Sequence, residues 1–224
     1  MERPIQFSAP MVWAILDGRK TMTRRVVKNP EHYGCITGDC PHQHKDECAE
    51  SLRLSCPYGQ TGDRLWVKEA LGCFDGEIPD SYEGRYAADG KTAFHGWQWK
   101  RAYLPGMFMP RWASRITLEV TAVRVERLQE IGEEDAKAEG VELLFSASEM
   151  KLPGLIGKQQ EVFGYKNYLW HGQAKGKIAD EWGHQHSNYS TARDSFSSLW
   201  QSINGKKYPW ESNPWVWVIE FTKI

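Results

Sequence analysis

Blocks of alternating polar and apolar positions predict a chain of short strands. The segment "SRITLEVTAVRVERL" is rich in β-branched residues and is the clearest β signal in the chain, so it predicts a long strand or a bent strand pair from Arg115 to Leu128. Weaker strands near Gly84–Ala87 and Trp97–Arg101 are expected within glycine- and aromatic-rich loops. The other predicted strands are Pro4–Phe7, the segment 20–27 ("KTMTRRVV"), Arg64–Glu69 and Trp215–Thr222.

Helical spacing of apolar residues predicts a first helix after the N-terminal strand. Ser8 is expected to cap this helix, with Pro10 in its first turn and Gly18 just past its end. Trp13 lies off the expected apolar stripe, which consists of Met11, Ile15 and Leu16.

Two further helices are predicted in the second half of the chain. A short one, "IGEEDAKAEGV", carries acidic residues in its first turn and is closed by Gly140. A longer one is capped by Ser190 or Thr191 and ends at Gly205, with an apolar stripe of Phe196, Leu199, Trp200 and Ile203.

The order of these elements indicates an α+β fold. Consecutive strands interrupted by few helices favour a small mixed β-barrel with short flanking helices over repeated βαβ units. We therefore expect one domain over residues 1–224, with irregular insertions at about 29–60 and about 144–189.

Composition narrows the classes of partner. The formal net charge of −1 over 224 residues argues against a protein that coats nucleic acid through bulk charge. No apolar run is long enough to span a membrane, and the polar N-terminus lacks the core of a signal peptide, so a cytoplasmic protein without membrane contact is expected. The eleven tryptophans are expected to fill a core between thin β layers, with a stacking pocket as the alternative.

The stretch "LDGRKTMTRRVV" combines basic residues with small hydroxyls. It fits the pattern Gly-x-Lys-x-x-x-x-Arg through Gly18, Lys20 and Arg25. With the following "TGDRLWV" segment, the long strand, the short acidic helix and the closing "WVWVIEF" strand, the chain resembles the ASCH domain, a branch of the PUA-like β-barrels. The resemblance covers roughly residues 3–30, 60–70, 110–141 and 190–224, and not the insertions.

Within that superfamily the chain is similar to long phage-associated ASCH proteins and to bacterial N(4)-acetylcytidine amidohydrolases. The resemblance implies hydrolysis of the acyl group from an N(4)-acylated cytosine nucleoside, with no cofactor for catalysis. It implies catalytic roles for Lys20, Thr23 and Glu139. The substrate-binding candidates are Arg25, Arg24, Gly18 and Trp66.

This chemistry suits the residue types. The nitrogen lone pair of an N-acylcytosine is drawn into the ring, so the amide is easier to cleave than a peptide. Hydrolysis needs a nucleophile or an activated water, a base, and an acid for the leaving amine. Lys20 would act as base for Thr23 if burial and the nearby Arg25 lower its pKa, and Glu139 would hold the lysine or protonate the amine.

Two other functions use the same residues. An RNA- or DNA-binding module would place Lys20, Arg24 and Arg25 on phosphates and stack a base on a tryptophan, and a ribonuclease would use them to stabilise the phosphorane. A carboxylate from Glu139 in the same cleft would repel phosphate, which favours a neutral nucleoside. The sequence leaves open the acyl group, the choice between nucleoside and RNA, and the oligomeric state.

The first insertion concentrates metal-binding side chains. Four of the five cysteines lie within 22 positions, which favours a structural zinc site in a reducing compartment. Reduced cysteines in a loop are the alternative. Cys73 stands apart and is expected to be buried. The expected ligands are Cys35, Cys40, Cys48 and Cys56, with His42 or His44 as a replacement for one of them.

Overall fold

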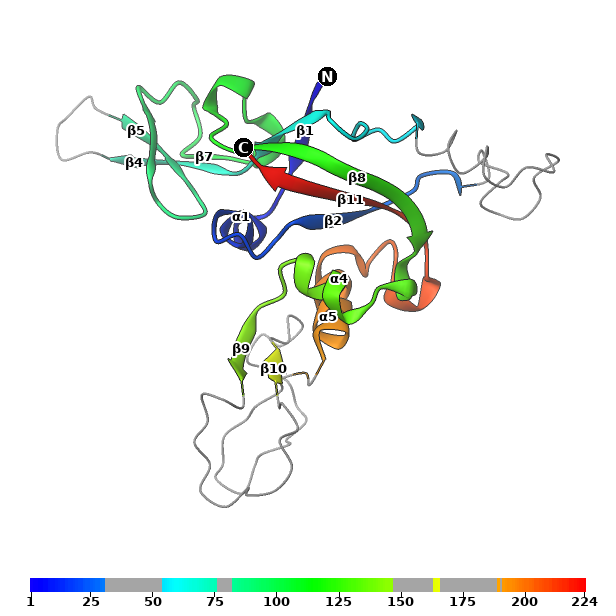
Figure 1. The fold of residues 1–224 in the computed structure, drawn as a ribbon. Coiled ribbons are helices and arrows are strands. Elements are labelled where there is room, and N and C mark those ends of the chain that lie inside the picture. The colour runs from blue at the N-terminus through cyan, green and yellow to red at the C-terminus, as the bar shows by residue number, and fades with distance from the viewer. Residues whose placement is uncertain (31–53, 76–81, 147–162, 166–188, 190) are drawn as a thin grey trace, which may run out of the picture. The chain divides into compact units, whose positions relative to one another are not determined.

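The computed structural model describes residues 1–30, 54–75, 82–146, 163–165, 189 and 191–224 (Figure 1). The chain divides into two compact units, of which the first comprises Met1–Val125 with Trp217–Ile224 and the second comprises Glu126–Val216. The predicted α+β class is confirmed.

The first unit is organised around a five-stranded sheet with the order β1-β3-β8-β11-β2. Strands β1 and β3 run parallel with Ile5 opposite Val67, whereas β3 and β8 run antiparallel with Leu65 opposite Leu118. All four of these side chains are buried, so register and burial agree. The strands are β1 (Glu2–Gln6), β2 (Met22–Val26), β3 (Arg64–Lys68), β8 (Thr117–Arg127) and β11 (Trp215–Lys223).

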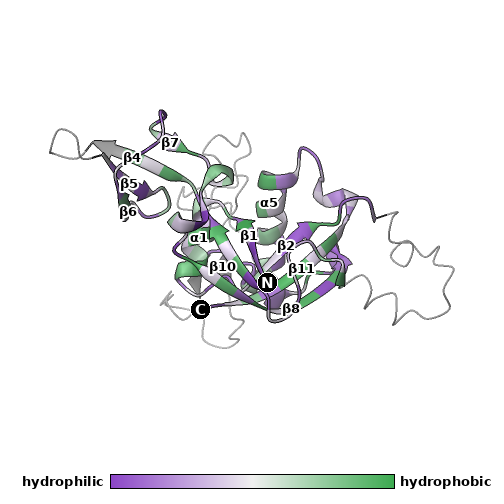
Figure 2. Ribbon diagram, turned by 90° about the horizontal axis from the view of Figure 1, so that it is seen from above, coloured by the Kyte–Doolittle hydropathy of each residue, from purple (hydrophilic) through white to green (hydrophobic). Residues whose placement is uncertain are grey.

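The predicted long strand is present as β8. Its residues alternate between buried and more exposed positions at its start, and Figure 2 shows apolar and polar bands succeeding one another along it. In the hydrogen-bonding order of the sheet, β1 and β2 are the two end strands, and the described strands do not form a closed barrel.

Helix α1 (Ala9–Leu16) begins and ends where the sequence predicts. It follows Ser8 with Pro10 in its first turn, and Gly18 adopts a positive φ of 75° just beyond its end. Ser8 occupies the predicted N-cap position, but its side chain makes no capping hydrogen bond. The predicted apolar stripe was wrong in part, because Met11 and Leu16 are only half-buried. The expectation followed the largest side chains, whereas the helix packs on the core through Val12, Ala14 and Ile15.

A second sheet lies within the first unit, in a region where loops were expected. Its order is β6-β5-β4-β7, and Leu71, Tyr86, Leu104, Met109 and Ala113 form a buried cluster with it. The strand predicted near Gly84–Ala87 is part of this sheet, but the strand predicted at Trp97–Arg101 was wrong, because the chain between β6 and β7 is irregular there. The elements are β4 (Leu71–Asp75), β5 (Tyr82–Tyr86), β6 (Thr92–His95), β7 (Tyr103–Leu104), η2 (Gly106–Phe108) and η3 (Arg111–Ala113).

The second unit contains two packed helices. The Glu133 carboxylate, on α4, accepts hydrogen bonds from the backbone N–H groups of Ala192 (2.9 Å) and Arg193 (3.2 Å) at the start of α5, where orphan donors need partners. Thr191 caps α5 by accepting from Asp194 N at 3.1 Å. The elements are η4 (Leu128–Glu130), α4 (Glu133–Ala138), β9 (Leu143–Ser146), β10 (Phe163–Tyr165), α5 (Ala192–Asn204) and η5 (Trp210–Ser212).

The predicted stripe on α5 is confirmed for Phe196, Leu199 and Trp200, which are buried, but not for Ile203, which is exposed. Ile203 lies in the last turn of the helix, beyond the residues that α5 packs inward. None of the helices in the described part of the chain has the length and apolar character needed to span a bilayer.

Candidate functional site

The predicted catalytic strand carries buried polar side chains. Lys20 is 2% exposed, Thr23 3% and Arg24 5%. The chain reaches this strand through a turn at Gly18, and the backbone N–H of Lys20 donates to Ala14 O at 2.9 Å, which anchors the strand to α1. An ammonium ion and a guanidinium are rarely buried unless their environment compensates them, so the burial of Lys20 and Arg24 distinguishes this strand from a solvated edge.

Two of the predicted site residues lie over the ring of Phe7. Lys20 Nζ lies 5.8 Å from the ring centroid, and Arg25 Cζ lies 5.2 Å from it. Phe7 in turn packs on Phe221 with a centroid distance of 6.2 Å, and Arg25 Nη2 donates to Gln6 O at 2.5 Å. The structure therefore brings Lys20 and Arg25 to one aromatic side chain.

Arg24 points into the protein interior. Its Nη1 lies 3.3 Å from the Sδ of Met22, and Arg124 Nη2 lies 3.9 Å from the same sulfur. Arg124 also forms an ion pair with Glu220. Because Arg24 is buried beside these groups, its guanidinium is poorly placed to contact the phosphates of a nucleic acid.

Trp66 lies away from the Phe7 ring. It alternates along β3 with Leu65 and Val67, which are buried, so Trp66 points to the opposite face of the sheet. The cations over its ring are Lys68, with Nζ at 5.4 Å, and Arg111, with Cζ at 5.8 Å. The basic residues at Trp66 are therefore Lys68 and Arg111, and not those of the predicted catalytic strand.

Glu139 is also buried, with 3% of its surface exposed. It ends α4, where its backbone N–H donates to Asp135 O at 2.9 Å, and Gly140 follows with a φ of 85°. Glu139 belongs to the second unit, whereas Lys20 and Thr23 belong to the first. The grouping of these three residues in one site stays a prediction.

Of the predicted zinc ligands, Cys35, Cys40 and Cys48 lie outside the described residues, as do His42 and His44. Cys56 is described and buried, and burial raises the pKa of its thiol. Its thiolate would therefore need a compensating cation. Within the described ranges no group of three or more His, Cys, Asp or Glu side chains is placed to hold a metal. Cys73, which the sequence predicted to be buried, is only half-buried.

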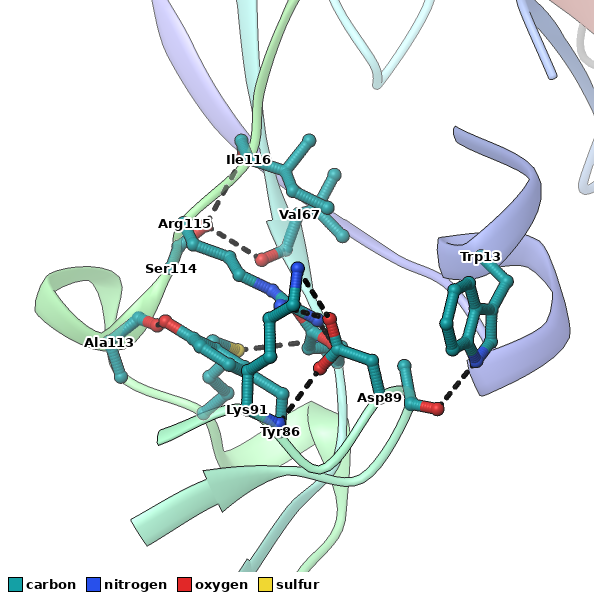
Figure 3. A network of polar contacts seen from close by, with 12 residues as sticks. Trp13, Val67, Tyr86, Asp89, Lys91, Ala113, Ser114, Arg115 and Ile116 are labelled. Carbon is teal, nitrogen blue, oxygen red and sulfur yellow. Dashed lines mark hydrogen bonds and ion pairs between the residues drawn. The ribbon is translucent and has the colours of Figure 1, made fainter. Parts of the chain in front are cut away.

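A buried charge network that the sequence did not predict lies beside the second sheet (Figure 3). Arg115 donates to Glu69 through Nε (2.8 Å) and Nη2 (2.9 Å), and to Asp89 through Nη1 (2.7 Å). Its guanidinium lies 3.7 Å from the centroid of the Tyr86 ring. The hydroxyl of Tyr86 donates to Ala113 O at 3.0 Å. Each polar group in this network has a partner, as burial requires.

The two carboxyls in the network titrate differently. Burial raises the pKa of Glu69, and the opposing hydrogen bonds from Arg115 do not cancel this effect. Burial also acts on Asp89, but hydrogen bonds from Arg115 and from the backbone N–H of Lys91 outweigh it and lower the pKa of this carboxyl. Glu69 and Arg115 are 46 positions apart, so only the pairing of β3 with β8 reveals the contact.

No protein-family model matches this sequence, and no curated protein or solved structure matches it either.

Proposed function

We propose that this protein is an amidohydrolase that removes the acyl group from N(4)-acylated cytosine nucleosides, on a PUA-like fold of the ASCH type. Lys20, Thr23 and Glu139 act in catalysis, and Arg25 binds the substrate. The observation that carries the proposal is the burial of Lys20 and Thr23 on one short stretch of chain, with Lys20 and Arg25 at the same Phe7 ring.

Burial and a neighbouring guanidinium both disfavour the charged form of an amine, which is what a lysine needs to act as a base. In the proposed reaction Lys20 takes the proton from the Thr23 hydroxyl or from a water held by it. The oxygen attacks the acyl carbon, the C–N bond to the exocyclic nitrogen breaks, and Glu139 or the lysine ammonium protonates the leaving amine. If the Thr23 oxygen attacks, it forms an acyl ester, and a water then hydrolyses this ester to release the carboxylic acid and restore the hydroxyl. If the water attacks, the carboxylic acid forms directly as the C–N bond breaks.

Nucleic-acid binding through the same strand is the second candidate. It requires basic side chains that reach phosphates at the surface. Arg24 and Lys20 are instead buried. Their burial supports a small neutral substrate over a polyanion on this strand, so the amidohydrolase is the better-supported function.

The test is incubation of the purified protein with N(4)-acetylcytidine, followed by the absorbance change that accompanies conversion to cytidine. Lys20→Ala and Thr23→Ala should each abolish turnover, and the double variant should be little worse than either single one, because residues that act as a unit are not additive. Glu139→Gln should lower turnover sharply, and Thr23→Ser should retain part of it.

Three exposed neighbours provide matched controls. Arg19→Ala, Thr21→Ala and Glu134→Gln change a basic residue, a threonine and a glutamate that lie close to Lys20, Thr23 and Glu139 in the sequence. These three positions are exposed, so the variants should retain wild-type turnover. Wild-type turnover in Lys20→Ala would refute the assignment. Absence of turnover in the wild type, with RNA affinity that both Lys20→Ala and Arg24→Ala lower, would favour the binding module.

A further inference from the structure

A cluster of four aromatic rings lies on the second sheet of the first unit, on other elements than the strand that bears Lys20 and Thr23. Trp112 packs edge-on against Phe94 at 4.9 Å and parallel to Trp99 at 6.2 Å. Trp97 continues the cluster, with its ring parallel to Phe94 at 6.0 Å and edge-on to Trp99 at 4.9 Å. We call these four residues the ring cluster.

One side of the ring cluster is fixed to the sheet. Phe94 covers Gly84 so closely that a Cβ at this glycine would lie 2.3 Å from the Phe94 ring. Phe94, Trp97 and Trp99 also pack against the buried cluster around Leu71. These contacts hold the rings in place before any ligand arrives, which lowers the entropic cost of binding.

The other side of the ring cluster is open. Trp112 is 59% exposed although it contacts two other rings. The same stretch of chain exposes Phe108 to 63%, as well as Tyr103 and Met107. Large apolar side chains gathered on a surface mark an interaction site.

The charge around the ring cluster identifies the kind of partner. The chain has no acidic residue between Asp89 and Glu119, although it contains 29 acids in 224 residues. The same interval contains five basic residues, of which Lys91, Arg111 and Arg115 pair with Asp89, Glu2 and Glu69. Lys100 and Arg101 directly follow Trp99 and are exposed. The basic residues of the interval are Lys91, Lys100, Arg101, Arg111 and Arg115.

The acidic residue on the neighbouring strand lies on the other face of the sheet. Glu83 is opposite His95 in the β5–β6 pairing, whereas Gly84 is opposite Phe94, so the two pairs point to opposite faces. The Glu83 carboxylate lies 3.3 Å from Nη2 of Arg85 and 3.7 Å from Nδ1 of His95. The face that bears Phe94 therefore has aromatic character without this carboxylate.

We propose that the ring cluster, with Lys100 and Arg101, binds a single-stranded polynucleotide. An exposed, pre-positioned tryptophan offers a stacking surface to any base, and adjacent cations meet the phosphates on either side of that base. A duplex keeps its bases stacked inside and cannot use the Trp112 ring. This binding site is separate from the proposed catalytic strand and does not rest on the proposed hydrolysis.

Fluorescence anisotropy with labelled 12-residue oligouridylate and oligothymidylate tests the proposal. Neither strand contains an acyl group, so binding is measured independently of hydrolysis, and comparison of the two strands tells RNA from DNA as the preferred ligand. Single strands should bind at least about tenfold more tightly than a duplex of the same length. If Lys100 and Arg101 contact two phosphates, a fourfold rise in salt should weaken binding about sevenfold.

Trp112→Ala should weaken binding by about fivefold or more, because stacking on one base contributes at least about that factor. Trp112→Phe keeps an aromatic ring and should restore most of the affinity. Lys100→Ala/Arg101→Ala should weaken binding and flatten the salt dependence. The matched control is Lys206→Ala/Lys207→Ala, which removes two adjacent exposed charges in the second unit and should bind as wild type.

Thermal unfolding of each variant verifies that the fold is retained. No binding by either single strand would overturn the proposal, as would equal affinity for the duplex. Binding that Trp112→Ala leaves unchanged would also overturn it. If the protein bound lipid vesicles or another protein but neither oligonucleotide, the ring cluster would have a different partner. That result would also refute the proposal.

Discussion

Arg115 and Glu69 form a bidentate ion pair in which two nitrogens of one guanidinium meet both oxygens of one carboxylate, at 2.8 and 2.9 Å. The Glu69 side chain is 1% exposed and that of Arg115 is 17% exposed. Glu69 follows the last residue of β3, and Arg115 lies two residues before β8. The third charge, Asp89, comes from the turn between β5 and β6, so this one arginine connects the two sheets of the first unit.

Arg115→Ala should destabilise the protein by about 3–5 kcal/mol, because it leaves two buried carboxylates without their cation. Urea unfolding followed by circular dichroism measures this loss as a lower midpoint with an unchanged slope. Arg115→Lys should recover only a part, since an ammonium group cannot pair with both oxygens of Glu69 and also reach Asp89.

Arg111 provides the matched control for this prediction. It also pairs with a carboxylate through two nitrogens, at 3.0 and 2.6 Å from the oxygens of Glu2, but the two side chains are 45% and 40% exposed. Arg111→Ala should therefore lower the urea midpoint far less than Arg115→Ala does. Equal losses in Arg111→Ala and Arg115→Ala would show that burial does not set the strength of these pairs.

Asp89 should contribute to loss of stability in acid. Its pKa in the folded protein is below the ordinary value of about 3.9, so the unfolded chain takes up protons first as the pH falls. This contribution is complete above the unfolded pKa and is lost as the pH falls through the folded pKa. Asp89→Asn should therefore flatten the acid side of a plot of unfolding free energy against pH below about pH 4. An unchanged acid limb would contradict the lowered pKa.

Glu69 should act in the opposite direction. Its pKa in the folded protein lies above the ordinary value of about 4.3, so the folded state binds the proton first as the pH falls. Its contribution to stability is therefore lost as the pH rises through the folded pKa. Glu69→Gln removes the titrating carboxyl and should abolish this part of the pH dependence. The loss of unfolding free energy below about pH 4, which Asp89 causes, should remain. Unfolding free energies measured between pH 3 and 8 separate the two.

Gly84→Ala should destabilise the second sheet by about 1–3 kcal/mol, because the added methyl group occupies space that the Phe94 ring fills. Gly132→Ala is the control: nothing lies within 4 Å of the added atom and its φ is −87°. Thermal unfolding compares the two. Gly84→Ala combined with Phe94→Ala should unfold no earlier than Phe94→Ala alone, since the clash is gone.

The first insertion should bind about one equivalent of zinc. Metal analysis of protein purified without added zinc measures it, and Cys56→Ser should lower the zinc content because a thiolate ligand is lost. Cys73→Ser is the matched control, since Cys73 lies outside the cysteine-rich segment and should leave the content unchanged. A wild-type protein without zinc would remove the site.

Local signals predicted the elements that have clear ends or a long alternating pattern. Helix α1 is bounded by Ser8 and Gly18, α5 by Thr191 and Gly205, and β8 is an eleven-residue strand that alternates at its start. These features act within a few residues of the chain, so the sequence contains them directly.

The second sheet was missed because its strands are short and lack alternation. Gly84 interrupts β5, yet it is the residue that admits the Phe94 ring. A strand was predicted at Trp97–Arg101, but Trp97 and Trp99 lie in an irregular segment, and their rings pack against each other in the ring cluster.

The candidate site divides in the same way. A local motif selected Lys20 and Thr23, both of which are buried, whereas no local pattern indicated that Glu69 and Arg115 pair across two strands. The surroundings of Trp66 likewise depend on Arg111, which lies 45 positions away along the chain.

The turn between β5 and β6 departs from the usual behaviour of a hairpin tip. Such tips are commonly the places where a chain tolerates extra residues or is cut by proteases, because they contact little else. Here the tip is fastened on both sides, by the Asp89 carboxylate on Arg115 and by the carbonyl of Ala88, which accepts from Trp13 Nε1 at 2.5 Å (Figure 3). Any lengthening of this turn would withdraw the carboxylate from its arginine, so the length of the hairpin is constrained by charge, and epitope tags or fluorescent inserts belong elsewhere in the chain.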